Sequence, residues 1–272
     1  DRFFSGLSFW SLMFEKRVLK IKGGSNFRDL GGYQTHDGKK ILWGRLFRGS
    51  ALNNFTNHDL RVLKRRHINT IIDFRSLDES LNDPDIYPET SNDIRLTVLD
   101  QDTTYSTITP EEFHRLSHSN GFAYKQMMNT YRRLITDEFS QQAYRQFFDY
   151  LLNQDDGAIL FHCTKGKDRT GIATALFFLA VGIDKKTIFQ DYLLTDTYNH
   201  EQTEVELERM VERGEDDDDI DNVKHFLLTD RNYLENAFAA MDEIAGSPQA
   251  YLKKYLGLSD EKIQILRNKY LS

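Results

Sequence analysis

The sequence predicts an α/β fold with a central sheet flanked by helices and a mostly helical C-terminal half. Short apolar, β-branched runs are interleaved with helical patterns in the first two thirds of the chain, and only helical patterns follow residue 186. Hydrophobic residues make up 39% and aromatic residues 12% of the 272 residues, which is enough for a full core. With four prolines and no Gly/Ser/Pro linker, we expect one domain.

Each element follows from a local pattern. Alternation and β-branched content predict strands at 41–47, 70–74, 94–99 and 158–162. Helical spacing of apolar residues predicts helices at 57–66, 122–135, 142–152 and 170–181, then at 186–194, 204–211, 231–244, 248–256 and 260–270. Thr56 is the expected N-cap of the first helix, and the polar stretch 103–120 is typical of a loop or lid.

The most informative segment lies between the last strand and the helix that follows it. Residues 162–171 read His-Cys-Thr-Lys-Gly-Lys-Asp-Arg-Thr-Gly and contain the only cysteine of the chain. Cys163 and Arg169 therefore stand at opposite ends of a loop that connects a strand to a helix. This arrangement suits a site that holds a phosphate against a thiolate.

The residue types in the loop match that chemistry. A thiolate is stabilised by the positive end of a helix dipole and by nearby cations, here Lys165, Lys167 and Arg169. Gly166 has no side chain to crowd the loop, so the N–H groups of Thr164 and its neighbours can form a nest for phosphoryl oxygens.

Two further side chains of the loop have expected roles. Arg169 can hold two phosphoryl oxygens at once, which lysine cannot do. The Thr170 hydroxyl is placed to donate a hydrogen bond to the Cys163 thiolate.

The segment has two other possible interpretations. A lone cysteine after an apolar strand is often a small buried hydrophobic residue, and sulfur-transferring enzymes also use a cysteine loop. The spacing of Cys163 and Arg169, together with Gly166 and Thr170, favours the phosphate loop.

The sequence His162-Cys163-x-x-Gly166-x-x-Arg169-Thr170 resembles the phosphate loop of cysteine-dependent tyrosine and dual-specificity phosphatases. Lys167-Asp168 before the arginine resembles the bacterial atypical tyrosine phosphatases, which also act on phosphoinositides. Further matches are Asn26-Phe27-Arg28-Asp29-Leu30-Gly31-Gly32, Leu46-Phe47-Arg48-Gly49-Ser50, Ile72-Asp73-Phe74-Arg75-Ser76 with Glu79, and Asp191-Tyr192-Leu193.

The resemblance implies a cysteine-phosphatase-like sheet and a single phosphatase domain at 25–272, preceded by an N-terminal extension at 1–24. It implies hydrolysis of phosphate monoesters in two steps. The Cys163 thiolate attacks phosphorus and forms a cysteinyl-phosphate, which water then hydrolyses to inorganic phosphate. Loop N–H groups and Arg169 hold the charge of the transition state, and neither a metal nor another cofactor is needed.

The general acid that protonates the leaving group has two candidate positions. Asp168 lies in the loop, as in the phosphatases that this chain resembles, and its position assures closeness to the phosphate. Asp100 and Asp102 follow the strand expected at 94–99, where many cysteine phosphatases supply an acid from a separate loop.

Several polar residues are expected to support the loop: His162, Asn26, Arg28, Asp29, Asp73 and Arg75. Arg28 and Asp29 are expected to pair with each other or with Asp73 and Arg75. Lys167 is a candidate partner of Glu79, in which case it is not available to substrate.

The substrate is expected to be a phosphorylated protein, with phosphotyrosine foremost, or a phosphoinositide whose extra phosphates meet Lys165 or Lys167. The alternative from a different class is a phosphate-binding module without turnover. The net charge of −7 argues against nucleic-acid binding through a broad basic face, and no run reaches the roughly 20 apolar residues of a membrane span.

Other charged and terminal segments have simple interpretations. The acidic run 214–219 is expected to be a solvated loop, and Lys64-Arg65-Arg66 to end a helix. The apolar N-terminal residues are expected to pack on the domain surface, with a targeting remnant as the alternative. Whether the protein is cytoplasmic or secreted is not decided by the sequence.

Overall fold

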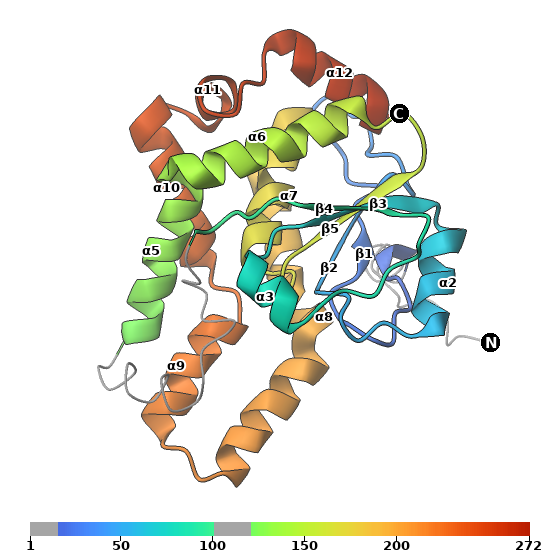
Figure 1. Ribbon diagram of the computed structural model, residues 1–272. Helices are drawn as coiled ribbons and strands as arrows, with labels where there is room; N and C mark the ends of the chain where they lie inside the picture. Colours follow the sequence, from blue (N-terminus) through green and yellow to red (C-terminus); the bar gives the residue numbers. More distant parts are fainter. Residues whose placement is uncertain (1–15, 101–120) are drawn as a thin grey trace, which may run out of the picture.

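A five-stranded sheet forms the centre of the computed structural model, which describes residues 16–100 and 121–272 (Figure 1). Its strands lie in the order β1, β2, β5, β3, β4. The strand β1 pairs antiparallel with β2, and the other three pairings are parallel. The strands are β1 (Arg28–Asp29), β2 (Leu46–Gly49), β5 (Ala158–His162), β3 (Ile68–Asp73) and β4 (Asn92–Arg95).

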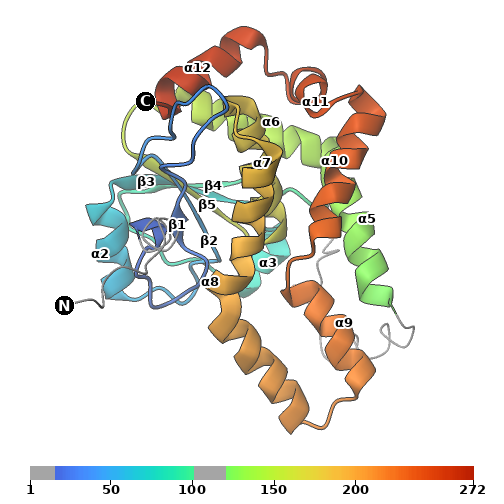
Figure 2. The same cartoon turned by 180° about the vertical axis from the view of Figure 1, so that it is seen from behind.

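Helices cover both faces of this sheet (Figures 1 and 2). On one side lies α2 (Asn57–Arg65), and on the other lie α6 (Glu138–Asn153) and α7 (Asp168–Val181). The remaining helices are α3 (Leu77–Asn82), α5 (Phe122–Thr136), α8 (Lys185–Glu212), α9 (Asp217–Leu227), α10 (Arg231–Ala245), α11 (Pro248–Lys254) and α12 (Asp260–Tyr270).

The two faces of the sheet contribute to two apolar cores because successive strand side chains point to opposite sides. In β5, Ile159 and Phe161 belong to the larger core, which includes side chains of α5, α6, α7 and α10. Leu160 lies in the smaller core with Val62 and Leu63 of α2. The middle strand is therefore fixed from both faces, and its C-terminal end at His162 is held firmly in place.

The predicted α/β class is confirmed, and so is the strand at 158–162. Thr56 caps α2, where its N–H and hydroxyl both donate to Asp59, and the basic run ends that helix. Two expected strands were wrong in extent: β2 begins only at Leu46, and β4 ends at Arg95. The helices expected at 186–194 and 204–211 form one continuous helix, α8.

The acidic run does not form the loop that was expected. Asp216 caps α9 by accepting the N–H of Asp219, and Asp217, Asp218 and Asp219 occupy its first turn. Carboxylates at this position stabilise the positive end of the helix dipole, so the charges that argue against a helix interior favour a helix start. The loop expected at 103–120 lies outside the described residues.

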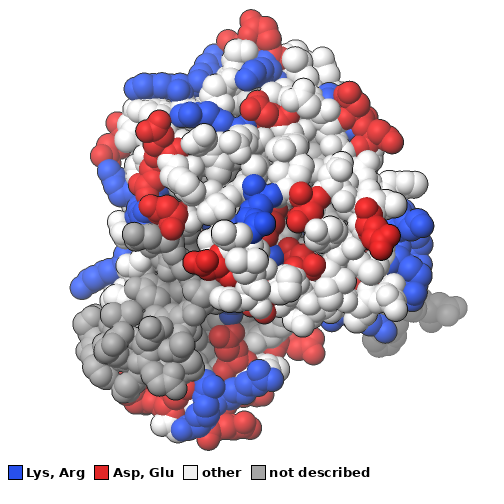
Figure 3. Space-filling view, in the orientation of Figure 1, with Lys and Arg blue, Asp and Glu red and all other residues white. Residues whose placement is uncertain are grey.

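Residues 16–24 pack on the rest of the chain, whereas the apolar residues 3–14, for which surface packing was expected, lie outside the described residues. Leu19 donates its N–H to Phe27 at 3.0 Å, and the N–H groups of Lys22 and Gly23 donate to the Asp59 carboxylate. Basic and acidic side chains are interspersed over the face in Figure 3. Among the described helices, none combines the length and apolarity needed to cross a bilayer.

Candidate active site

The strand β5 carries His162 to the edge of the sheet, and Cys163 follows as the first residue of the loop that leads into α7. The pairing of His162 with Gly49 on one side and Asp73 on the other places the loop between the ends of β2 and β3. Cys163 is buried, and α7 begins at Asp168. The N–H groups at the start of α7 are therefore close to the loop, as anion binding requires.

Three consecutive loop carbonyls are bonded by groups that lie outside the loop. The oxygen of Thr164 accepts from the N–H of Ala51 at 3.0 Å. The oxygen of Lys165 accepts from Asn26 and Asn199, each at 3.2 Å. That of Gly166 accepts from Asn26 at 2.8 Å and from Arg48 at 2.7 Å.

This bonding orients the loop amides. In a planar trans peptide the N–H points opposite to the C=O. Because the three carbonyls face outward, the N–H groups of Lys165, Gly166 and Lys167 are directed away from those outer donors, toward the interior of the loop. Such a run of amides forms an anion-binding nest.

Gly166 is required where it lies. Its φ of +64° is in the left-handed region, and a Cβ built on it would lie 2.3 Å from the carbonyl oxygen of Gly49. A glycine was expected here because a side chain would crowd the loop. The structure shows that the crowding would come from the end of β2, which approaches the loop closely.

Arg169 is held by a carboxylate from α3. Its two terminal nitrogens donate to both oxygens of Glu79, at 2.6 and 2.8 Å, and Thr164 donates its hydroxyl to the same carboxylate at 2.7 Å. Burial alone would raise the pKa of Glu79, but the charge and hydrogen bonds of Arg169, with those of Ser76 and Thr164, hold that pKa at about 2. Glu79 is therefore ionised, and its carboxylate holds the Arg169 guanidinium in place.

Beneath the loop lies a buried group of two arginines and one aspartate. Asp191 of α8 accepts from Arg28 at 3.1 Å and from Arg48 at 2.8 Å, and all three side chains are at most 1% exposed. Burial would raise the pKa of Asp191, but the two guanidinium charges keep it well below its ordinary value. We call these three residues the arginine strut, because Arg48 connects Asp191 to the carbonyl of Gly166.

The expected partners of Arg28 and Asp29 were wrong. Arg28 reaches Asp191 and the side chain of Asn26, whereas Asp29 accepts the N–H groups of Gly31 and Gly44, each at 2.8 Å. Asp29 thus braces the turn between β1 and β2. The distant partner could not be foreseen, since Asp191 is remote in sequence.

His162 lies in a second buried charged group. Its Nδ1 is 3.8 Å from Asp73 and its Nε2 is 3.3 Å from Asp85, while Arg75 donates to both carboxylates. Burial would lower the pKa of His162, but the two carboxylates outweigh it and raise that pKa to about 9. His162 is therefore an imidazolium at neutral pH.

Two carboxylates and an imidazole close together could in principle bind a metal ion. Ligand atoms of Asp73, Asp85 and His162 lie within 4.8 Å of one another. However, the guanidinium of Arg75 already supplies positive charge to both carboxylates, at 2.9 and 2.6 Å. The donor set is thus satisfied by an arginine, and it does not fit a divalent cation without displacing that side chain.

Asp168 occupies the first helical position of α7. Its Oδ1 accepts from the Tyr131 hydroxyl at 2.7 Å and lies 3.0 Å from the Lys167 ammonium. Lys167 is buried and also donates to the carbonyl of Leu228 at 3.0 Å. The expected pairing of Lys167 with Glu79 was wrong, because Arg169 occupies that carboxylate.

The other predicted residues are placed differently. Asp100 is bonded by Arg133 of α5 at 2.9 Å and its side chain is 50% exposed, while Asp102 lies outside the described residues. The Thr170 hydroxyl is buried and has no hydrogen-bond partner among the described residues, so the expected bond to Cys163 is not formed. The helix begins two residues earlier than predicted, at Asp168, and the Thr170 side chain is already set by the first turn of α7.

Five residues of the site were not assigned a role by sequence reasoning: Arg48, Asp85, Tyr131, Asp191 and Asn199. Charged residues in otherwise apolar, buried segments were the available signal for Arg48 and Asp191. Tyr131 carried no such signal, since an aromatic residue at helical spacing indicates a core position.

The five-stranded sheet flanked by helices, with the Cys–Arg loop between its middle strand and a helix, is consistent with a cysteine-phosphatase-like fold. The model of the tyrosine phosphatase family matches residues 19–272, so the chain belongs to that family and is a phosphatase.

Three relatives carry names that agree with this. A tyrosine-protein phosphatase, by its name, from Cupriavidus necator is 29% identical over 91% of this chain and 86% of its own length. The triple specificity protein phosphatase PtpB of Mycobacterium tuberculosis is 28% identical over 92% of this chain and 98% of its own length. A tyrosine-protein phosphatase of Nostoc commune is 27% identical over 81% of this chain and 72% of its own length.

Proposed function

We propose that this phosphatase hydrolyses phosphate monoesters through a cysteinyl-phosphate formed on Cys163, with phosphotyrosine in proteins as the first substrate class and phosphoinositides as the second. The observation that carries the proposal is the outward bonding of the Thr164, Lys165 and Gly166 carbonyls. It turns successive amides toward one point, where a phosphoryl group would sit.

The residues around that point have complementary roles in the proposed reaction. The Cys163 thiolate attacks phosphorus, the S–P bond forms, and the bond to the leaving oxygen breaks. Arg169, fixed by Glu79, contacts the equatorial oxygens together with the loop amides. Water then cleaves the S–P bond and releases inorganic phosphate. His162, Asn26 and the arginine strut hold the loop and do not contact substrate.

Asp168 is the proposed general acid. Its carboxyl group follows the loop directly and is oriented by Tyr131, which also shares a hydrogen bond with Tyr192 at 2.7 Å. Asp100 is paired with Arg133 of α5 and does not adjoin the loop in sequence, and Asp102 remains the alternative from the segment that follows. Catalytic hydrogen bonds often tighten only when substrate is bound, so Lys167 is proposed to exchange Asp168 for a phosphoryl oxygen.

The positions of the two lysines support the proposed order of substrate classes. Lys165 is 40% exposed and pairs with Glu206, whereas Lys167 is buried against the segment before α10. Neither ammonium is placed to bind a second phosphate in this arrangement, which favours phosphotyrosine. The name of the Mycobacterium tuberculosis relative, a triple specificity phosphatase, agrees with a broader range.

The test is phosphate release from phosphotyrosine, phosphoserine and phosphothreonine peptides and from mono- and polyphosphorylated phosphoinositides. We expect turnover that is abolished by Cys163→Ser and by Arg169→Ala, with phosphotyrosine preferred. A Cys163→Ser variant that keeps turnover would contradict the proposal. Binding of phosphate without turnover by the unmodified protein would instead support the non-catalytic phosphate-binding module.

A further inference from the structure

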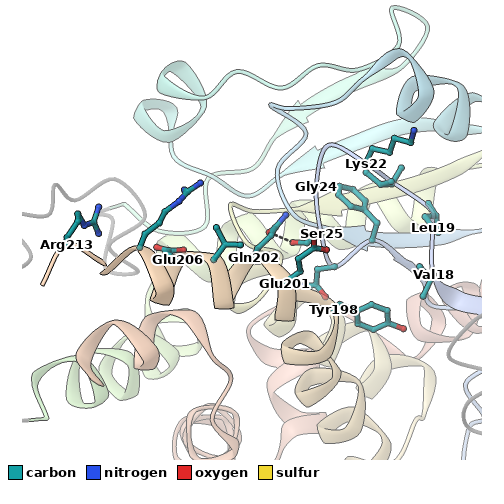
Figure 4. Close-up of a pocket in the computed structure, with 15 residues that line it drawn as sticks. Val18, Leu19, Lys22, Gly24, Ser25, Tyr198, Glu201, Gln202, Glu206 and Arg213 are labelled. Atoms are coloured by element: carbon teal, nitrogen blue, oxygen red, sulfur yellow. Dashed lines mark hydrogen bonds between the residues drawn. The ribbon is translucent and has the colours of Figure 1, made fainter. Parts of the chain in front are cut away.

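A groove runs beside the loop, between the N-terminal segment and the second half of α8 (Figure 4). Its volume is about 770 Å³. Val18, Leu19 and Lys22 come from one wall, while Tyr198 and Gln202 come from α8 and Arg213 directly follows that helix (Figure 4). We call it the α8 groove.

The α8 groove is joined to the loop by direct contacts. Glu206, which lines it, forms an ion pair with Lys165 of the loop at 2.7 Å. Ser25, also in its wall, donates to Asn199 at 2.6 Å, and Asn199 in turn bonds the Lys165 carbonyl. These contacts place the groove next to the outer side of the loop at Lys165, so a polypeptide whose phosphoryl group occupies the loop would pass this residue to enter the groove.

The length of the groove matches a short peptide. From Tyr198 to Arg213 the wall follows α8 for about 22 Å at the usual helical rise. An extended chain advances about 3.3 Å per residue, so about six residues fit along it. A small aryl phosphate held in the loop would leave the groove untouched.

Its chemistry favours apolar and acidic side chains. Val18, Ile21 and Val205 line it, and Val205 is 40% exposed. Glu206 is paired with Lys165, and Arg213 with Glu215 at 2.8 Å.

The charges that stay open in the groove are mostly positive. In the part of the chain that the structure describes, Lys22 and Arg209 have no ion-pair partner. Glu201 also lines the groove, together with apolar side chains, and this mixture suits the varied side chains of a peptide better than a uniformly anionic, polyphosphorylated headgroup.

We propose that the α8 groove binds the polypeptide that flanks the phosphorylated residue, and that Val205 and Arg209 select apolar and acidic flanking residues. The inference rests on the proposed function, whose substrate class it narrows to an extended phosphopeptide.

The experiment compares three substrates: 4-nitrophenyl phosphate, a phosphotyrosine peptide with about six apolar and acidic residues on each side, and vesicles that contain a phosphoinositide. Val205→Glu and Arg209→Glu should each raise KM for the peptide about tenfold, because the apolar contact or the opposite charge is lost, with little change in kcat. Neither should change hydrolysis of the aryl phosphate. Val211→Glu is the matched control, since Val211 is a 63% exposed valine on α8 that does not line the groove.

Equal effects of Val205→Glu and Val211→Glu on the peptide would overturn the inference. So would a loss confined to phosphoinositide vesicles, which would assign the groove to a lipid. If the unmodified enzyme fails on the aryl phosphate, the proposed function fails instead. In that case the groove is tested by binding: fluorescence anisotropy measures the affinity of the labelled peptide for Cys163→Ser, alone and combined with Val205→Glu or Val211→Glu.

Discussion

At the residue scale, the general acid is the position on which the proposed reaction depends most. Asp168→Ala should lower kcat far more for an alkyl phosphate, a poor leaving group, than for 4-nitrophenyl phosphate, because only the poor leaving group needs the proton. An effect on the order of a hundredfold or more is expected on the poor substrate. Asp100→Ala serves as the comparison. If Asp100→Ala shows the leaving-group dependence and Asp168→Ala does not, the assignment is reversed.

Glu79 tests the idea that Arg169 must be held in place. Glu79→Gln keeps the size of the side chain but removes the charge and one acceptor from the bidentate pair. A charge-assisted hydrogen bond contributes roughly 1.5–3 kcal/mol, so kcat/KM should fall about tenfold to a hundredfold. Asp78→Asn, on the exposed side of the same helix, should leave the rate constant unchanged. Equal rates in both variants would show that Arg169 needs no partner.

At the scale of elements, the loop between β5 and α7 depends on its approach to the end of β2. Gly166→Ala should destabilise the protein and abolish turnover, because the added Cβ would meet the Gly49 carbonyl at 2.3 Å. Gly44→Ala is the control, since Gly44 has a similar φ of +74° with open space around it. Urea denaturation should show a cost of about 1 kcal/mol for Gly44→Ala and several kcal/mol for Gly166→Ala. Equal costs in the two variants would mean that the positive φ, and not the contact with Gly49, determines the loss of stability.

Elements differ in how well the sequence predicted them, for physical reasons. The strand β5 and the helix α7 are nearly continuous apolar runs, and α10 and α12 have helical spacing of apolar residues; the predicted positions of all four agree with the structure to within two residues. The short strand β1 exists only because β2 pairs with it, and no local signal reveals such a partner. The helix α9 was missed because its acidic start was interpreted as repulsion rather than as capping.

The site shows the same division. Cys163, Gly166, Asp168 and Arg169 lie within one short segment of the sequence, so their proximity could be predicted from the chain alone. Asp191 lies 143 residues after Arg48, with which it forms an ion pair, and only the folded structure brings them together. Partners of buried charges therefore remained unassigned. The division between an extension at 1–24 and a domain at 25–272 stays a prediction.

At the scale of the whole molecule, the buried charges couple stability to pH. The pKa of His162 is about 9 in the folded protein, against about 6.5 for an ordinary histidine. A raised folded-state pKa gives a contribution that is fully present below pH 6.5 and is lost as pH rises through 9. The free energy of unfolding should thus fall by up to about 3 kcal/mol between pH 6.5 and 9.

Urea denaturation across this pH range measures the effect. His162→Gln should flatten the dependence, and His200→Gln, on a 73% exposed side chain, should leave it unchanged. An unchanged slope in His162→Gln would show that the imidazolium between Asp73 and Asp85 is not its source.

The most direct test of the central claim is to trap the phosphoryl group on Cys163. Asp168→Ala, mixed with 4-nitrophenyl phosphate, quenched in acid and analysed by peptide mass spectrometry, should carry one phosphoryl group on the peptide that contains Cys163. The same peptide from Cys163→Ser should carry none. Continued turnover by the unmodified enzyme with no phosphate on Cys163 at any quench time would contradict a cysteinyl-phosphate intermediate.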